Sequence, residues 1–277
     1  MVAVETMTRP RIDLGRTVEY IENCQTGDGG YFFARIPPSP AGDTYYAVKS
    51  LQILGRQPAN RDSVIDWLRE SATGGLLGNP KGVFFLVEAS LALGLPPAEL
   101  QRWASRLHDF ANPEGGFGAW RNVDVEVASE LDITYRAVTT LLDLGLEMER
   151  DGVLRFLFRF LNRDGGFGTN DHSTLASTYY AVQVLARLGV EKDELDATVR
   201  WLGRREAIWD LLYLEQVHRL VMSLIALNEV PRERQRAIDL VLDCRRENGG
   251  FARARFGIPT LEYTHYALEA LSALEVM

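Results

Sequence analysis

The chain has 277 residues, of which 46% are hydrophobic and 25% charged, a composition typical of a soluble globular protein. Its net charge of -8 argues against nucleic acid as a partner. No apolar run reaches the roughly 18 residues of a membrane span, and residues 1–16 lack the apolar core of a secretory signal. We therefore expect a cytoplasmic protein without a transmembrane segment.

A glycine doublet followed by an aromatic or aliphatic residue recurs along the chain at intervals of 45, 41, 50 and 84 residues. The last interval is twice 42, so one copy is degenerate. A period of this size indicates a repeat protein. The doublets are Gly29-Gly30, Gly74-Gly75, Gly115-Gly116, Gly165-Gly166 and Gly249-Gly250.

Apolar segments with helical spacing flank each doublet. Those before the doublets cover residues 18–24, 64–68, 100–110, 153–161, 199–202 and 238–244. Those after them include residues 44–55, 134–145, 178–189 and 264–275, which start on Thr and mostly end on Gly. The Thr is expected to cap the first turn and the Gly to adopt a left-handed conformation. Residues 190–230 lack the doublet but keep the two-helix frame, so the sequence predicts six helix pairs.

The first and last units are as apolar as the middle ones, whereas an open solenoid needs polar-faced ends. We therefore expect an all-α fold, an α/α toroid (barrel) of six helix pairs that forms a single domain over residues 1–277. The segments after the doublets would form the inner wall. Cys24 and Cys244 are interpreted as buried apolar residues, with a disulfide across the ring closure as the alternative.

Aligned on their C-terminal ends, the inner helices carry an aromatic or His residue in the first turn. These residues are Tyr45, Phe84, Tyr135, Tyr179, His218 and His265, and the next positions hold Tyr46, Phe85, Arg136, Tyr180, Arg219 and Tyr266. Because neighbours on a helix face different ways, one set is expected to line a central funnel and the other to pack between the helix layers. Aromatic faces suit polyunsaturated chains and stabilise carbocations by about 0.5 to 2 kcal/mol per contact.

With its Gln-Thr-Gly-Asp-Gly-Gly-Tyr segment at residues 25–31, Asp-Gly-Gly-Phe-Gly at residues 164–168 and Thr-Tyr-x-Ala helix starts, the chain resembles the prenyltransferase and squalene cyclase repeat superfamily over essentially its whole length. The resemblance implies an α/α toroid that acts on isoprenoids. Activities in this superfamily run from zinc-dependent protein prenylation to terpenoid cyclisation that starts with a protonation.

Class II terpenoid cyclases carry an Asp-x-Asp-Asp-Thr-Ala run, and the third inner helix here begins Glu130-Leu131-Asp132-Ile133-Thr134. The resemblance implies that Asp132 is the catalytic acid and Glu130 the partner that orients it. Such an acid must stay protonated at neutral pH, which an apolar pocket and a second carboxyl can arrange. The alternative is that Asp132 only caps the helix.

Zinc prenyltransferases imply an Asp-x-Cys at the fifth inner helix and a His at the sixth, but Tyr213, Glu215 and Tyr263 occupy those registers. A different metal site is suggested by two Glu-x-x-His pairs in matching registers. The ligands would be Glu215, His218, Glu262 and His265, which suit zinc or iron. Their alternative role is structural, since Glu at a helix start pairs with the helix dipole. A diphosphate substrate would bring Mg²⁺ with it.

The leading hypothesis is a class II-like terpenoid cyclase that protonates a polyene or prenyl diphosphate. Two others are metal-dependent prenyltransferase-like group transfer and a non-catalytic isoprenoid- or protein-binding toroid. Such cyclases close their active site between two barrels, so we expect a partner chain or a homodimer to cover the mouth. The expected substrate-binding residues are Tyr45, Phe84, Tyr135, Tyr179, Trp209, Tyr213, Arg136 and Arg219.

Overall fold

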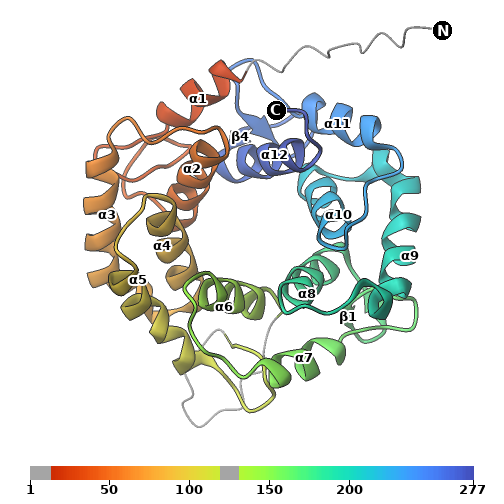
Figure 1. Cartoon of the computed structure of the whole chain (residues 1–277). Helices are drawn as coiled ribbons and strands as arrows, with labels where there is room; N and C mark the ends of the chain where they lie inside the picture. Colours follow the sequence, from red (N-terminus) through yellow and green to blue (C-terminus); the bar gives the residue numbers. More distant parts are fainter. Residues whose placement is uncertain (1–13, 119–130) are drawn as a thin grey trace, which may run out of the picture.

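The computed structural model describes residues 14–118 and 131–277, and the helices of this part form two concentric layers (Figure 1). The inner layer has six helices of 13 residues each. At 1.5 Å per residue, each is about 20 Å long. These helices are α2 (Ala41–Ile53), α4 (Pro80–Ala92), α6 (Leu131–Asp143), α8 (Leu175–Arg187), α10 (Leu214–Ala226) and α12 (Leu261–Ala273).

The outer layer consists of α1 (Gly15–Glu22), α3 (Arg61–Thr73), α5 (Pro97–Ala104), α7 (Arg150–Phe158), α9 (Asp196–Arg205) and α11 (Arg234–Asp243). Short 3₁₀ helices complete the described connections at Leu76–Gly78, Ser105–Phe110, Lys192–Leu195 and Glu206–Leu211. Two small antiparallel hairpins precede inner helices. They pair β1 (Gly168–Thr169) with β2 (His172–Ser173), and β3 (Phe251–Ala252) with β4 (Pro259–Thr260).

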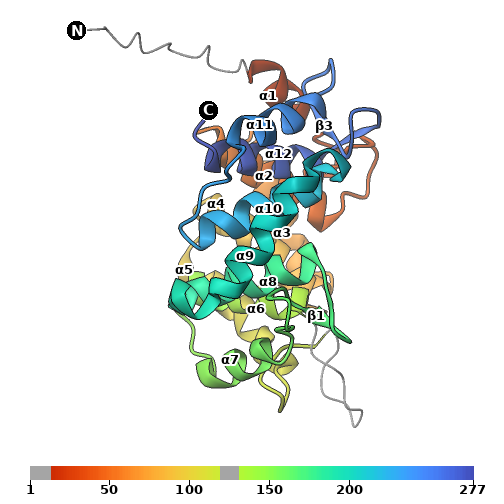
Figure 2. The same ribbon diagram turned by 90° about the vertical axis from the view of Figure 1, so that its right-hand side faces the viewer.

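The inner helices close into a ring. Each packs against the inner helix on either side, and the last, α12, packs against α2 (Figure 1). The edge-on view in Figure 2 places the connections that carry the β-hairpins together at one end of the ring. The toroid of six helix pairs predicted from the repeat is therefore confirmed.

The repeat has a steric cause, seen best where the ring closes. Gly249 has a φ of 90°, in the left-handed region, and a Cβ atom there would collide with the backbone of Arg16 at the start of α1. Gly165 has a φ of 93° and approaches the carbonyl of Ala197 at the start of α9 in the same way. The first glycine of these doublets is thus the point where one unit touches the outer helix of the next.

The Thr residues do not cap the inner helices, because those helices begin three residues earlier. Thr44 Oγ1 instead accepts the backbone N–H of Tyr31 at 3.0 Å. The same 3.0 Å bond recurs at Thr134, Thr178 and Thr264, each time from the Phe that follows a doublet. Each Thr therefore fastens a glycine turn to its inner helix. The expected left-handed Gly is present at the ends of four inner helices: Gly55, Gly94, Gly145 and Gly189.

Large apolar side chains fill the space between the two layers, among them Trp67, Trp103 and Trp201. Cys24 and Cys244 are both buried and both free, as the apolar interpretation predicts. No helix in residues 14–118 and 131–277 is long and apolar enough to cross a membrane.

Candidate active site at the centre of the ring

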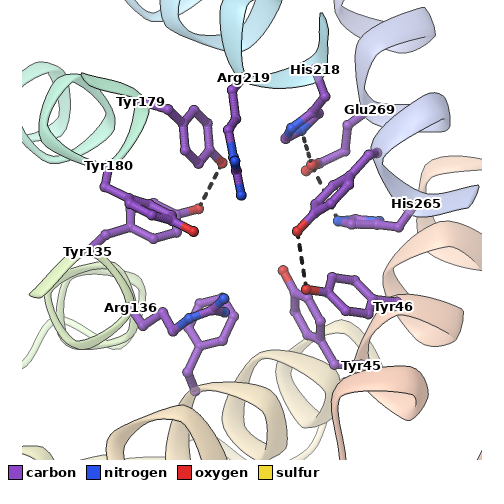
Figure 3. A pocket seen from close by; sticks show the side chains of 12 residues that line it. Tyr45, Tyr46, Tyr135, Arg136, Tyr179, Tyr180, His218, Arg219, His265 and Glu269 are labelled. Atoms are coloured by element: carbon purple, nitrogen blue, oxygen red, sulfur yellow. Dashed lines mark hydrogen bonds and ion pairs between the residues drawn. The ribbon is translucent and has the colours of Figure 1, made fainter. Parts of the chain in front are cut away.

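A pocket lies where the second turns of the six inner helices meet (Figure 3). All six helices contribute to it, so their N-terminal ends face the same end of the ring. Its cavity volume is about 40 Å³, room for a few water molecules. The lining side chains therefore fill most of the centre, and a long ligand enters only if some of them turn. They are Tyr45, Tyr46, Phe84, Tyr135, Arg136, Tyr179, Tyr180, His218, Arg219, His265, Tyr266 and Glu269.

Both adjacent positions line the pocket on five of the six helices, so the expectation that one set would pack between the layers is wrong. Neighbouring residues are about 100° apart around a helix, and tyrosine and arginine are long enough to reach the centre from either direction. Tyr135 and Tyr179 share a hydrogen bond between their hydroxyls at 3.3 Å. Tyr45 and Phe84 have ring centroids 5.1 Å apart. The rings form a nearly continuous aromatic belt.

Two arginines bring positive charge into this belt. The guanidinium of Arg136 lies 4.8 Å from the ring centroid of Phe84, and that of Arg219 lies 5.9 Å from that of Tyr180. Neither arginine forms an ion pair with an acidic residue of the described chain, and Nε of Arg136 is buried without a hydrogen-bond partner. As far as the described residues go, the pocket thus holds two cations without an acidic partner, which favour an anion.

A carboxylate that the sequence analysis did not identify joins two histidines of the pocket. Glu269 Oε2 lies 2.8 Å from Nε2 of His218 and 3.3 Å from Nε2 of His265. Burial alone would raise the pKa of Glu269, but His265 and the His218 hydrogen bond outweigh it and hold that pKa at about 2. Burial lowers the pKa of His265 to about 4, although Glu269 opposes the shift. The sequence signal was the spacing, since Glu269 lies four residues after His265, on the same helix face.

A second buried carboxyl, that of Glu88, lies one helical turn beyond the pocket-lining Phe84. Glu88 follows Phe84 by four residues on α4, and its side chain is 4% exposed. Burial raises the pKa of Glu88 to about 7, against the attraction of Lys49. The ammonium of Lys49 is 3.9 Å from Oε2, and Oε1 of Glu88 has no hydrogen-bond partner among the described residues. This carboxyl therefore retains a proton close to neutral pH.

The four residues expected to bind a metal do not converge. Glu215 forms an ion pair with Arg253 at 2.9 Å, while Glu262 accepts hydrogen bonds from Tyr46 at 3.1 Å and Tyr266 at 2.9 Å. His218 and His265 turn toward Glu269 instead. Across residues 14–118 and 131–277, no cluster of three or more His, Cys, Asp or Glu side chains is arranged to hold a metal ion.

Asp132 lies in the first turn of α6, where its carboxylate is 3.0 Å from the ammonium of Lys81 on α4. Its side chain is 23% exposed and is not among those lining the pocket. A cation, rather than the expected apolar wall, therefore neighbours it. Its proposed partner, Glu130, lies outside the described residues.

Six of the eight expected substrate-binding residues line the pocket, and two do not. Trp209 lies in the 3₁₀ helix Glu206–Leu211, 1% exposed and away from the centre. Tyr213 is 47% exposed, and the guanidinium of Arg253 stacks over its ring at 4.1 Å. Both residues precede α10, which begins at Leu214, whereas His218 and Arg219 in its second turn do line the pocket.

Comparison with known proteins identifies the fold. The prenyltransferase alpha-alpha toroid domain matches residues 1–81, 77–211 and 206–276. A drimenyl diphosphate synthase of Streptomyces showdoensis is 28% identical in an alignment of 268 positions that covers 86% of this chain. The chain spans 50% of the length of that relative.

Solved structures share the ring at low sequence identity. Candida albicans protein geranylgeranyltransferase-I complexed with GGPP matches with a TM-score of 0.74 and 16% identity, over 95% of this chain and 91% of that chain. A type II terpene cyclase from Scytonema, in complex with its substrate geranylgeranyl dihydroxybenzoate, matches with a TM-score of 0.70 and 14% identity, over 95% and 97% of the two chains.

Proposed function

Because the chain belongs to the prenyltransferase alpha-alpha toroid family, we propose that it is a class II-like terpenoid cyclase that acts on a prenyl diphosphate. One observation carries the proposal: the ring of aromatic side chains encloses two arginines that have no acidic partner among residues 14–118 and 131–277. Such a pocket suits a substrate with an anionic head and an unsaturated hydrocarbon chain.

The aromatic belt supports a reaction through carbocations. Each face of a tyrosine or phenylalanine attracts a cation by about 0.5 to 2 kcal/mol, more where water is excluded. The rings already hold the guanidiniums of Arg136 and Arg219 in this way. A protonated polyene folded against the same rings would gain similar stabilisation without reacting with them.

The arginines favour a charged isoprenoid over a hydrocarbon such as squalene. A diphosphate would accept charge-assisted hydrogen bonds from Arg136 and Arg219. The N-terminal ends of the six inner helices add partial positive charge at the same end of the ring. The name of the drimenyl diphosphate synthase relative also puts a diphosphate on its product.

Asp132 is the proposed acid, by its position in the motif, and Glu88 is the second carboxyl in contention. Asp132 must give up its ion pair with Lys81 to act as a donor. Glu88 needs no such change, because burial raises its pKa to about 7. The variants Asp132→Asn and Glu88→Gln distinguish the two, since the true donor cannot be replaced by an amide.

A second polypeptide is proposed to cover the mouth. The loops that lead into α2 and α12 carry exposed apolar side chains, among them Ile36, Phe256 and Ile258. Their exposed fractions are 62%, 84% and 74%. The chain spans half of its curated relative, which leaves that relative a further half of its own length. A partner chain or a second copy laid over these loops would shield the reaction from water.

The test is turnover of geranyl, farnesyl and geranylgeranyl diphosphates, with squalene as the uncharged comparison. We expect a cyclised diphosphate from at least one prenyl diphosphate and none from squalene. Binding without conversion would instead support a non-catalytic isoprenoid carrier. Transfer of the prenyl group to a peptide, dependent on added zinc, would support the prenyltransferase alternative. Metal analysis of the purified protein accompanies the assay.

A further inference from the structure

A carbocation reaction that starts with a protonation must also end, usually by loss of a proton from a carbon next to the cation. The pocket therefore needs a proton acceptor as well as a donor. Most of its lining residues are tyrosine, phenylalanine or arginine. Burial raises the pKa values of Tyr45, Tyr179 and Tyr266 well above the ordinary value, so their hydroxyls stay protonated. The acceptors that remain among the lining residues are His218, His265 and Glu269.

The hydrogen bonds of this cluster fix where the protons sit. An ionised carboxylate only accepts hydrogen bonds, so Nε2 of His218, which is hydrogen-bonded to Glu269 at 2.8 Å, must donate. Nε2 of His265 lies 3.3 Å from the same oxygen, and the negative charge there favours a proton on that nitrogen. A neutral imidazole with a proton on Nε2 has a lone pair on Nδ1. Both Nδ1 atoms are buried and have no hydrogen-bond partner in the described chain. The cluster thus presents two unused bases at the wall of the pocket (Figure 3).

We propose that His218 and His265 form the proton-accepting group that ends the cyclisation, and that Glu269 is the positioning residue that sets their tautomer. The inference rests on the proposed function. In this step the C–H bond next to the cation breaks, its electron pair forms the C=C bond, and the proton moves to Nδ1. The proton gained at the start balances the proton lost, so substrate and product are isomers.

The surroundings suit a base of this kind. The pKa of His265 is about 4, so its imidazole is neutral at physiological pH and its lone pair is free. A weak base is sufficient, because a C–H bond next to a carbocation is a far stronger acid than an imidazolium. Once protonated, either imidazole gains the full charge attraction of Glu269 at 2.8 or 3.3 Å. Stacking of His218 on Tyr266, with centroids 4.6 Å apart, holds its ring plane in place.

The experiment measures the products formed from farnesyl and geranylgeranyl diphosphates by His218→Asn, His265→Asn and the double variant. Asparagine keeps an N–H donor for Glu269 but cannot take up the proton. We expect the double variant to lower the ratio of alkene to water-quenched alcohol at least about tenfold, since water then captures the cation. The matched control is His172→Asn, at an exposed residue of β2, which should leave the ratio unchanged.

Glu269 is tested as a positioning residue by Glu269→Gln and Glu269→Asp. Glutamine removes the charge and should shift the product ratio in the same direction, whereas aspartate should restore part of it. An unchanged alkene fraction in the double histidine variant, with turnover within twofold of wild type, overturns the inference while leaving the cyclase proposal intact. A wild type that converts none of geranyl, farnesyl and geranylgeranyl diphosphates overturns both. Thermal unfolding curves identify variants that fail to fold. If the double variant is one of them, the product ratios of the single variants His218→Asn and His265→Asn are compared with wild type instead.

Discussion

Nζ of Lys81 on α4 lies 3.0 Å from Oδ2 of Asp132 on α6, and this ion pair joins two neighbouring inner helices at the mouth of the ring. Both side chains are partly exposed to solvent, at 49% and 23%. Exposed pairs contribute little to stability, so any large effect of changing them must have another cause. Substitution of these two residues can therefore distinguish a catalytic role of Asp132 from a structural one.

Replacing either partner should hardly affect folding. We expect Lys81→Met and Asp132→Asn each to lower the free energy of unfolding by less than about 1 kcal/mol in urea titrations. If Asp132 is the acid, Asp132→Asn lowers turnover by about 100-fold or more. A loss of stability above about 2 kcal/mol, with turnover retained, would make Asp132 a structural residue.

Removing the charge of Arg136 should weaken the binding of a diphosphate. Charge-assisted hydrogen bonds contribute about 1.5 to 3 kcal/mol, so Arg136→Met should raise KM for a prenyl diphosphate about 10- to 100-fold. Arg136→Lys should restore part of the affinity. Arg200→Met, on the exposed face of α9, serves as the matched control. Equal KM values for all three variants would rule out an anion site at Arg136.

Glu88 should make the protein less stable as the pH rises from about 4.5 to about 7. Its pKa is raised from 4.5 to about 7, so the folded state binds the proton more tightly than the unfolded state. The contribution of this proton binding to the free energy of unfolding is fully present below pH 4.5 and is lost as the pH rises through 7. Between pH 5 and pH 8, Glu88→Gln should gain about 1 to 3 kcal/mol relative to wild type. Lys49, Asp143 and Arg187 also act on Glu88, and Lys49→Met should increase the loss.

Acid should destabilise the ring through the histidine cluster. The pKa of His265 is lowered from 6.5 to about 4, so the unfolded state binds its proton first as the pH falls. Stability is therefore lost between pH 6.5 and 4, by roughly 2 to 3 kcal/mol, and Glu269 extends the loss toward pH 2. Chemical denaturation across this range should show a flatter profile for His265→Asn. If stability fell with pH in the same way in His265→Asn and in wild type, the lowered pKa of His265 would not be the cause of the loss.

The ring closure should be sensitive to a single methyl group. Gly249 and Gly75 have similar positive φ values, 90° and 100°, but only Gly249 faces the backbone of another helix. Alanine at either site meets backbone strain of about 1 to 2 kcal/mol. Gly249→Ala should cost clearly more than Gly75→Ala in melting experiments, because α1 must also move. Equal losses of stability would mean that α1 moves away from residue 249 at little energetic cost.

The fold was predictable because its cause is local and repeated. Gly165 and Gly249 must be glycine for reasons of φ and contact, and Thr178 and Thr264 recur because each accepts the same backbone N–H. Such constraints leave a spacing that a single sequence displays. The aromatic belt was predictable for the same reason, because its members occupy the same positions in successive inner helices.

The polar part of the pocket was not predictable in the same way. Glu269 is identified by its partners, and one of them, His218, lies on another helix 51 residues away in sequence. The raised pKa of Glu88 depends on burial, which the sequence does not state. Trp209 and Tyr213 lie outside the pocket because α10 begins only at Leu214, a boundary that no glycine doublet marks in the sequence of this unit.

The contact between α12 and α2 means that no helix pair stands at an end of the array. Linear repeat proteins fray from their terminal units, where each unit has a single neighbour. Here every inner helix has two neighbours, so local opening anywhere breaks two interfaces at once. Amide hydrogens of the six inner helices should therefore exchange at similar rates and report one shared opening event.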